Sequence, residues 1–137
     1  MPAASRTIYF KNNAGCLWEE PESYLRLEYY PGKREEAQFR ALLSHARQAL
    51  QRHGWNRILI DQQHMTAFSA AEANWLLHDW LPVTVRETGY RHGAVLLAHD
   101  VFARLAMTSV EAAANQQVSI YRNFSDEATA LAWLLKQ

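Results

Sequence analysis

The sequence is poor in cysteine, in net charge and in long apolar runs, and each shortage excludes a class of protein. Cys16 is the only cysteine, which excludes an intramolecular disulfide and a multi-cysteine zinc site. Fourteen basic residues balance fourteen acidic ones, so the chain lacks the excess positive charge that gives proteins nonspecific affinity for nucleic acids. No apolar run approaches the ~20 residues that span a bilayer. We therefore expect no nucleic-acid partner and no membrane span.

The composition that remains is typical of one folded domain. Apolar residues make up 49% of the chain and charged residues 20%, a balance that suits a packed globule. A lone cysteine fits a reducing compartment, and the N-terminal residues include no apolar segment of signal-peptide length. We expect a single domain over residues 1–137, disordered at 1–5 and located in the cytoplasm.

The first quarter of the chain has the pattern of an antiparallel meander. Turn-forming Asn, Gly and Pro residues separate three segments of strand-forming residues, namely 7–10, 15–19 and 24–30. In the third segment Leu25, Leu27 and Tyr29 alternate with residues that are mostly polar. This alternation predicts that one face packs inward and the other stays mostly polar.

Helices and short apolar strands alternate along the rest of the chain. Helical spacing predicts helices at 34–53 and 69–81, and apolar runs predict strands at 58–60, 94–98 and 118–121. Gly54 and Gly89 are typical helix stops, and Pro82 predicts a kink or a fresh turn. Because strands joined by single helices generally become parallel, we predict an α/β fold. Its mixed sheet has helices packed against it, and its edges include the N-terminal strands.

Capping residues mark three helix starts. Ser69 and Glu72 have the spacing of a capping box, while Asp100 and Ser125 are placed to cap the two later helices. Apolar residues at helical spacing predict a buried stripe on each of these later helices. The stripe that follows Asp100 contains Phe102, Leu105, Ala106, Ser109 and Ala113, and the closing stripe contains Ala128, Leu131, Ala132 and Leu135.

Two segments together resemble a known family. In residues 57–80, RILIDQQHMTAFSAAEANWLLHDW, a strand ends in Asp61 and a helix begins eight residues later. This arrangement resembles the central segment of STAS domains, the bacterial anti-sigma-factor antagonist (SpoIIAA-like) fold. The closing strand, Phe124 and a helix that carries Glu-Ala and Ala-Trp-Leu resemble the ending of stand-alone SpoIIAA-like proteins. The resemblance covers about residues 5–137 and implies a regulatory role through protein contact.

The resemblance also implies a switch position that this chain does not fill. Phosphorylatable members begin the helix with Asp-Ser-Ser-Gly or Asp-Ser-Thr-Gly. Aligned on Asp61, Ala70 and Ala71 occupy the places of the two hydroxyl residues. Ser69 lies one position earlier, where an N-cap oxygen bonds the helix's own N–H groups and a phosphate would lie close to Glu72. We expect the phosphorylation switch of related regulators to be missing.

Polar residues follow the predicted parallel strands, and open α/β sheets concentrate function at that edge. The candidate interaction surface comprises Asp61, His64, Ser69, Trp75, Trp80, His99 and Asp100, and Gln62, Gln63, Arg122 and Asn123 lie on the same predicted loops as its polar members. Its carboxylates and histidines admit two interpretations: an acid–base pair or three-ligand metal site, or a strand-end Asp, a helix cap and two exposed histidines. No metal-ligand spacing, nucleophile elbow, phosphate loop or dinucleotide fingerprint occurs. We therefore expect no cofactor, no metal and no catalysis.

The helix at 69–81 is apolar over more than one face, because Trp75 and Trp80 lie five residues apart and spread around an α-helix. Three explanations stay open: a second chain covers the excess face, the face lines a pocket for a hydrophobic ligand, or a small domain packs its aromatics in one core. We rank a non-enzymatic, homodimeric interaction module first and a protein that binds a lipid or another hydrophobic small molecule second. A small enzyme that uses Asp61, His64, His99 or Asp100 ranks third.

Overall fold

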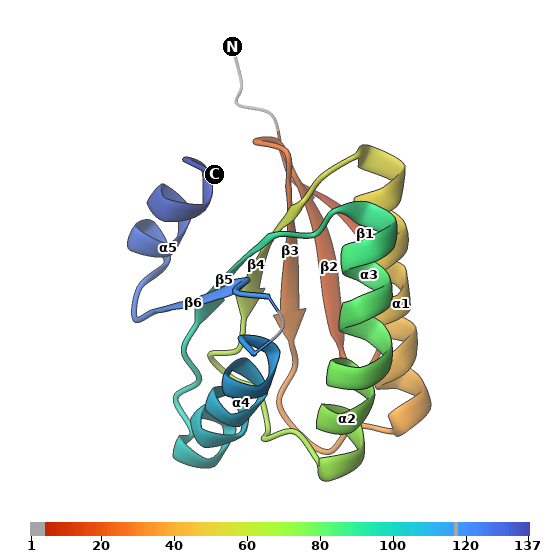
Figure 1. The fold of residues 1–137 in the computed structure, drawn as a ribbon, viewed down its shortest axis with the longest axis vertical. Helices are drawn as coiled ribbons and strands as arrows, with labels where there is room; N and C mark the ends of the chain where they lie inside the picture. The colour runs from red at the N-terminus through yellow and green to blue at the C-terminus, as the bar shows by residue number, and fades with distance from the viewer. Residues whose placement is uncertain (1–4, 117) are drawn as a thin grey trace.

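The computed structural model describes residues 5–116 and 118–137, so the disorder expected at 1–5 falls, except for Ser5, outside the described residues. One sheet of six strands forms the centre of the molecule, and its strands follow one another in sequence order. Helices lie on both faces of this sheet (Figure 1). No helix in the part of the chain that the structure describes is long and apolar enough to cross a membrane.

The sheet is mixed, as predicted. Its antiparallel half is the N-terminal meander, with β1 at one edge, and the remaining strands pair in parallel. The strands are β1 (Thr7–Lys11), β2 (Gly15–Glu20), β3 (Tyr24–Tyr29), β4 (Arg57–Asp61), β5 (His92–Leu96) and β6 (Tyr121–Phe124).

Two of the predicted strands lie at the wrong residues. The strand expected at 94–98 is β5, which begins two residues earlier because His92 pairs with Arg57 of β4. The strand expected at 118–121 is β6, which begins at Tyr121, opposite Gly93. The apolar Ile120 precedes β6 and is buried in the core. Backbone pairing, and not apolar character alone, sets these boundaries.

The helices largely agree with the predicted pattern. They are α1 (Glu36–His53), α2 (Ala70–Trp75), the π-helical turn η1 (Leu76–Trp80), α3 (Leu81–Thr88), α4 (Val101–Ala114) and α5 (Glu127–Leu134). Gly54 and Gly89 end α1 and α3 in the left-handed conformation that glycine adopts readily. The predicted cap at Ser125 is wrong by one residue, because the Asp126 carboxylate accepts the Thr129 N–H.

The chain remains helical from α2 to α3, and where a kink or a fresh turn is predicted, a π turn ends at Trp80 and α3 begins with Pro82 in its first turn. At the π turn the Leu81 N–H donates to the Leu76 carbonyl five residues back, a π-helical bond. Residues five apart therefore share a side, and the expectation that Trp75 and Trp80 spread around the helix is wrong. Both tryptophans contact α1, because Trp75 lies edge-on to Phe39 and the Trp80 indole N–H donates to the Leu43 carbonyl.

Two cores fill the two faces of the sheet. Ile58 and Ile60 point into the larger core, which α1, α2, η1, α3 and α4 cover, whereas Leu59 points into a smaller core under α5. The second face of β3, which is predicted to stay mostly polar, is also covered, because Tyr24 and Arg26 are buried there. The stripe predicted for α5 is half right: Leu131 and Leu135 pack against the smaller core, but Ala128 and Ala132 are exposed, and the buried residues are Ala130 and Leu134.

Candidate functional site

The loops after β4 and β5 bring the two predicted histidines together. The rings of His64 and His99 meet edge to face, with their centroids 5.2 Å apart. The His99 N–H donates to the Gln63 carbonyl at 3.0 Å, which holds the two loops side by side. Both side chains are exposed. Sequence reasoning therefore located a real juxtaposition at the carboxyl edge of the parallel strands.

The carboxylate of Asp61 is buried and engaged in structural contacts. Arg26 donates to Asp61 Oδ2 at 2.9 Å and to Glu127 Oε1 at 2.8 Å, so this guanidinium joins β3, β4 and α5. The backbone N–H and the side-chain amide of Gln63 donate to Asp61 Oδ1 at 3.1 and 3.0 Å. All these contacts hold the strand end in place, and each carboxylate oxygen is already engaged by Arg26 or Gln63.

Asp100 acts as a helix cap, as predicted. Its Oδ2 accepts the Ala103 N–H at 2.9 Å at the start of α4. Among the described residues neither Asp61 nor Asp100 hydrogen-bonds His64 or His99, and no three His, Cys, Asp or Glu side chains gather where they could hold a metal ion. The geometry favours the interpretation as a strand-end Asp, a cap and two exposed histidines.

Ser69 and Glu72 form the predicted capping box. The Ser69 Oγ accepts the Glu72 N–H at 3.0 Å, and Glu72 Oε1 accepts the Ser69 N–H at 2.8 Å. Arg34 donates a hydrogen bond at 2.9 Å to each carboxylate oxygen of Glu72. The sequence pattern does not predict this contact, because it places Arg34 in the helix at 34–53, whereas α1 begins at Glu36. Burial alone would raise the pKa of Glu72, but the hydrogen bonds from Arg34 and Ser69 outweigh burial and leave this pKa lowered.

Ser69 lies on the rim of an open groove between α2 and the chain before α1. The groove has a volume of about 380 Å³, and Gly32, Lys33, Thr66 and Ala71 also line it. The polar groups nearest to Ser69 are already paired with one another, because the Thr66 hydroxyl accepts the Gly32 N–H at 2.8 Å and Arg34 binds Glu72. These polar groups of the groove therefore already have hydrogen-bond partners within the protein.

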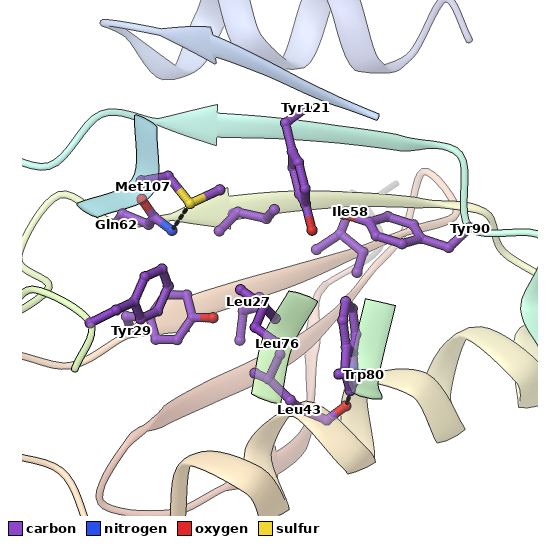
Figure 2. Close-up of a pocket in the computed structure, with 12 residues that line it drawn as sticks. Leu27, Tyr29, Leu43, Ile58, Gln62, Leu76, Trp80, Tyr90, Met107 and Tyr121 are labelled. Carbon is purple, nitrogen blue, oxygen red and sulfur yellow. Dashed lines mark hydrogen bonds between the residues drawn. The ribbon is translucent and has the colours of Figure 1, made fainter. Parts of the chain in front are cut away.

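A small cavity lies between the sheet and the helices of the larger core. The open space within it is about 10 Å³, enough for roughly one water molecule. Figure 2 shows the hydroxyls of Tyr29 and Tyr121 turned toward its interior, and the Gln62 amide donates to the Met107 sulfur at 3.3 Å. Trp80 closes one side of the cavity. The domain's own core therefore covers the excess apolar face of the second helix.

The helix α4 exposes three residues of its predicted stripe, Phe102, Leu105 and Ser109, while Ala106 packs against the larger core as predicted. Phe102 is 69% exposed, Leu105 59% and Val101 52%, and we call these three residues the α4 face. The residues that point into the core are instead Ala103, Met107, Val110, Glu111 and Ala114. Both sides of the helix have apolar residues at helical spacing, so periodicity alone selected the wrong side.

The α4 face stands out from the rest of the described surface. Apart from its three residues, Ile8 on β1 is the only large hydrophobic side chain exposed in residues 5–116 and 118–137. The face begins one residue after Asp100 and so adjoins the loop that carries His99. Large apolar patches on soluble proteins commonly mark interaction sites. The predicted stripe contains Phe102 and Leu105 of this face, though not Val101, and it places them in the core.

Comparison with known proteins identifies a family. A family model described as SpoIIAA-like matches residues 28–135. The match extends from β3 to the last turn of the chain and includes both histidines, the capping box and the α4 face. No curated protein matches the chain.

Proposed function

This chain belongs to the SpoIIAA-like family, and from that premise we propose that it is a non-enzymatic regulatory module of the STAS type that acts by binding another protein. The family is one of regulatory and interaction modules, so the membership supports the class of function. The specific surface and the kind of partner are argued from the geometry of this chain.

The observation that carries the proposal is the exposed α4 face. Val101, Phe102 and Leu105 together offer roughly 300–400 Å² of apolar surface on two turns of one helix. Exposing so much apolar surface costs free energy in water, and covering it with a partner recovers that cost. His99 lies two residues before Val101, and His64 lies against His99, so polar groups are found beside the start of this face, as at the rims of protein interfaces.

The contacts of the carboxylates support a non-enzymatic role. A general base must reach its substrate with a free lone pair, whereas Asp61 is held by Arg26 and Gln63, and Asp100 by its own helix. A catalytic histidine also needs an orienting partner, and the described residues provide neither His64 nor His99 with a carboxylate. The candidate surface therefore suits recognition better than proton transfer.

The helix start at Ser69 supports regulation by contact and not by phosphorylation. The first two positions of α2 hold Ala70 and Ala71, and the Ser69 hydroxyl is engaged in the cap. A phosphate on Ser69 would break the cap and lie beside the Glu72 carboxylate. We infer that this chain keeps the scaffold of related bacterial regulators and works in the cytoplasm, where its buried thiol, Cys16, stays reduced.

Binding of a hydrophobic small molecule is the second candidate, and one observation favours it. The Tyr90 hydroxyl is buried beside the cavity with no hydrogen-bond partner among the described residues. A small ligand with one hydrogen-bonding group would satisfy this hydroxyl, but the helices would have to separate to admit it. Native mass spectrometry of the purified protein tests this candidate, since a retained ligand would add to the mass of 15.8 kDa.

Photo-crosslinking in cells tests the proposed function directly. A photoreactive phenylalanine analogue replaces Phe102 in one variant and Ile8 in a control variant, because both side chains are exposed and apolar. We expect a discrete protein adduct from position 102 and none from position 8. Equal yields from the two positions, or no adduct from position 102, would overturn the proposal.

A further inference from the structure

We propose that the α4 face binds a second copy of this chain, with the two α4 helices antiparallel about a two-fold axis. The inference rests on the proposed function, because it names the partner of the same face. It starts from a size gradient along α4. Apart from Arg104 and Thr108, the exposed side chains in the first half of the helix are large and apolar (Val101, Phe102 and Leu105), and those in the second half are small (Ser109, Ala112 and the partly exposed Ala113).

An antiparallel copy complements this gradient. If the two-fold axis passes the outer side of α4 at the level of the buried Met107, residues at equal distances along the helix from that level face each other across the axis. Phe102 then lies opposite Ala112 of the second copy, Leu105 opposite its Ser109, and Val101 opposite its Ala113. Every large side chain therefore meets a small one, which lets the helices approach closely. A parallel copy would instead stack large on large and small on small.

Charge does not oppose this pairing. No acidic or basic residue lies among the six residues that form the proposed contact, the three large and the three small ones named above. Arg104, at the flank of this contact, is the only charged side chain exposed on α4. The two Arg104 side chains would lie on opposite sides of the axis, about 9 Å apart along the helices at 1.5 Å per residue. The chain as a whole has no net charge, so two copies do not repel each other at long range.

The area of the α4 face indicates a weak dimer. Its large side chains offer roughly 300–400 Å², about half of the ~800 Å² that each partner buries in a standard interface. Figure 1 shows α4 at the flank of its helical layer, apart from α1 and α3, so a second helix can approach it. We expect a dissociation constant in the micromolar range or weaker, with fast exchange between monomer and dimer.

Sedimentation equilibrium over about 10 µM to about 1 mM measures this association. The wild-type mass is expected to rise from 15.8 kDa toward twice that value. Phe102→Asp is expected to remain monomeric throughout, because its charge would be buried against Ala112 of the second copy. Ile8→Asp, which places the same charge on an exposed apolar residue of β1, is expected to dimerise like the wild type.

A swap of large and small residues tests the antiparallel register. Ala112→Phe alone puts two phenylalanines opposite each other and is expected to weaken the dimer at least tenfold. The double variant Phe102→Ala/Ala112→Phe restores a large residue opposite a small one and is expected to dimerise within about threefold of the wild type. Circular dichroism verifies that each variant is folded. If the double variant remains as weak as Ala112→Phe alone, the register is wrong.

The outcomes separate this inference from the proposed function. A wild-type protein that remains monomeric at about 1 mM overturns the second copy as the partner. If position 102 then crosslinks to an unlike protein in cells, the proposed function stands and only the identity of the partner changes. If neither association nor a crosslink occurs, both proposals fail. A lipid surface as the occupant would be identified by wild-type protein that floats with vesicles of neutral and anionic lipid while Phe102→Asp does not.

Discussion

Two helical segments of this protein have the same apolar excess in sequence and opposite fates in the structure. The turn η1 buries Trp80 to 2% exposure, while α4 leaves Phe102 69% exposed. Both segments have apolar residues on more than one side, so periodicity alone does not separate them. The difference shows that an apolar excess on a helix indicates a need for a neighbour, and that the neighbour can come from the same chain or from another one.

The position of each helix on the face of the sheet explains why one apolar excess is buried and the other is exposed. The segment containing η1 lies beside α1, and its π turn brings both Trp75 and Trp80 onto that neighbour. The helix α4 lies at the flank of the same layer, where its inner side contacts the core through smaller residues such as Ala103 and Ala114. Only the outer side of α4 still lacks a partner in the described structure.

The largest effect is expected where the apolar excess is covered. Trp80→Ala removes a buried indole and its hydrogen bond to the Leu43 carbonyl, and should lower the free energy of unfolding by about 3–5 kcal/mol. Phe102→Ala should change it by less than about 0.5 kcal/mol, because its ring is in solvent. Urea unfolding followed by circular dichroism compares the two variants. Equal losses would mean that α4 is covered in the monomer after all.

The buried ion pair of Glu72 with Arg34 at the start of α2 should make the free energy of unfolding depend on pH. The ionised form of Glu72 at the start of α2 is held by Arg34 and Ser69, which leaves its pKa lowered despite burial. Because the folded pKa lies below the unfolded one, this carboxylate stabilises the fold above the unfolded pKa, and the contribution is lost as the pH falls through the folded pKa. Glu72→Gln should cost roughly 1.5–3 kcal/mol at pH 7. The difference between the variant and the wild type should shrink as the pH falls below about 4, and a pH-independent difference would contradict this account.

The acidic residue buried on the inner side of α4, Glu111, should respond to pH in the opposite direction. Burial raises the pKa of Glu111, and the hydrogen bond from the Asn123 amide, at 2.7 Å, only partly offsets this effect. The folded protein therefore loses stability as the pH rises from the pKa of Glu111 in the unfolded chain to its higher pKa in the folded protein. Glu111→Gln should raise the free energy of unfolding at pH 7 by about 0.5–1 kcal/mol. The check is urea unfolding at pH 4 and pH 7, and a loss at pH 7 would show that the charge is needed.

The smallest effect on stability is expected at the α4 face itself. Phe102→Asp should leave the free energy of unfolding within about 0.5 kcal/mol of the wild type in dilute solution, where we expect both proteins to be monomeric. Thermal unfolding at about 5 µM, compared with Ile8→Asp, checks this expectation. A substantial loss of stability in Phe102→Asp alone would place Phe102 in the core and remove the basis for a docking surface.

Local chemistry made much of this fold predictable. The capping box at Ser69, the cap at Asp100 and the stop at Gly54 depend on residues within a few positions of one another, and all three are present. The strand that ends at Asp61 is also correct, because its apolar run is buried on both faces. The meeting of His64 and His99 followed from the general rule that parallel strands end at one edge.

Features that depend on distant contacts were not predictable in the same way. The π turn at η1 changes which residues share a side, and no periodicity of 3.6 residues reveals it. The side of α4 that faces the core is set by contacts with distant parts of the chain, and it carries Ala103 and not Phe102. The ion pair of Arg34 with Glu72 joins residues 38 positions apart. Local patterns carry no signal for that pairing.

The central claim is that this molecule associates through the outer side of α4. The most direct test is an NMR dilution series of ¹⁵N-labelled protein from about 1 mM to about 20 µM. The account predicts concentration-dependent amide shifts at Val101, Phe102, Leu105, Ser109 and Ala112, with none on β1 or α2. Shifts that map to β1 or α2, or spectra that do not change on dilution, would contradict it.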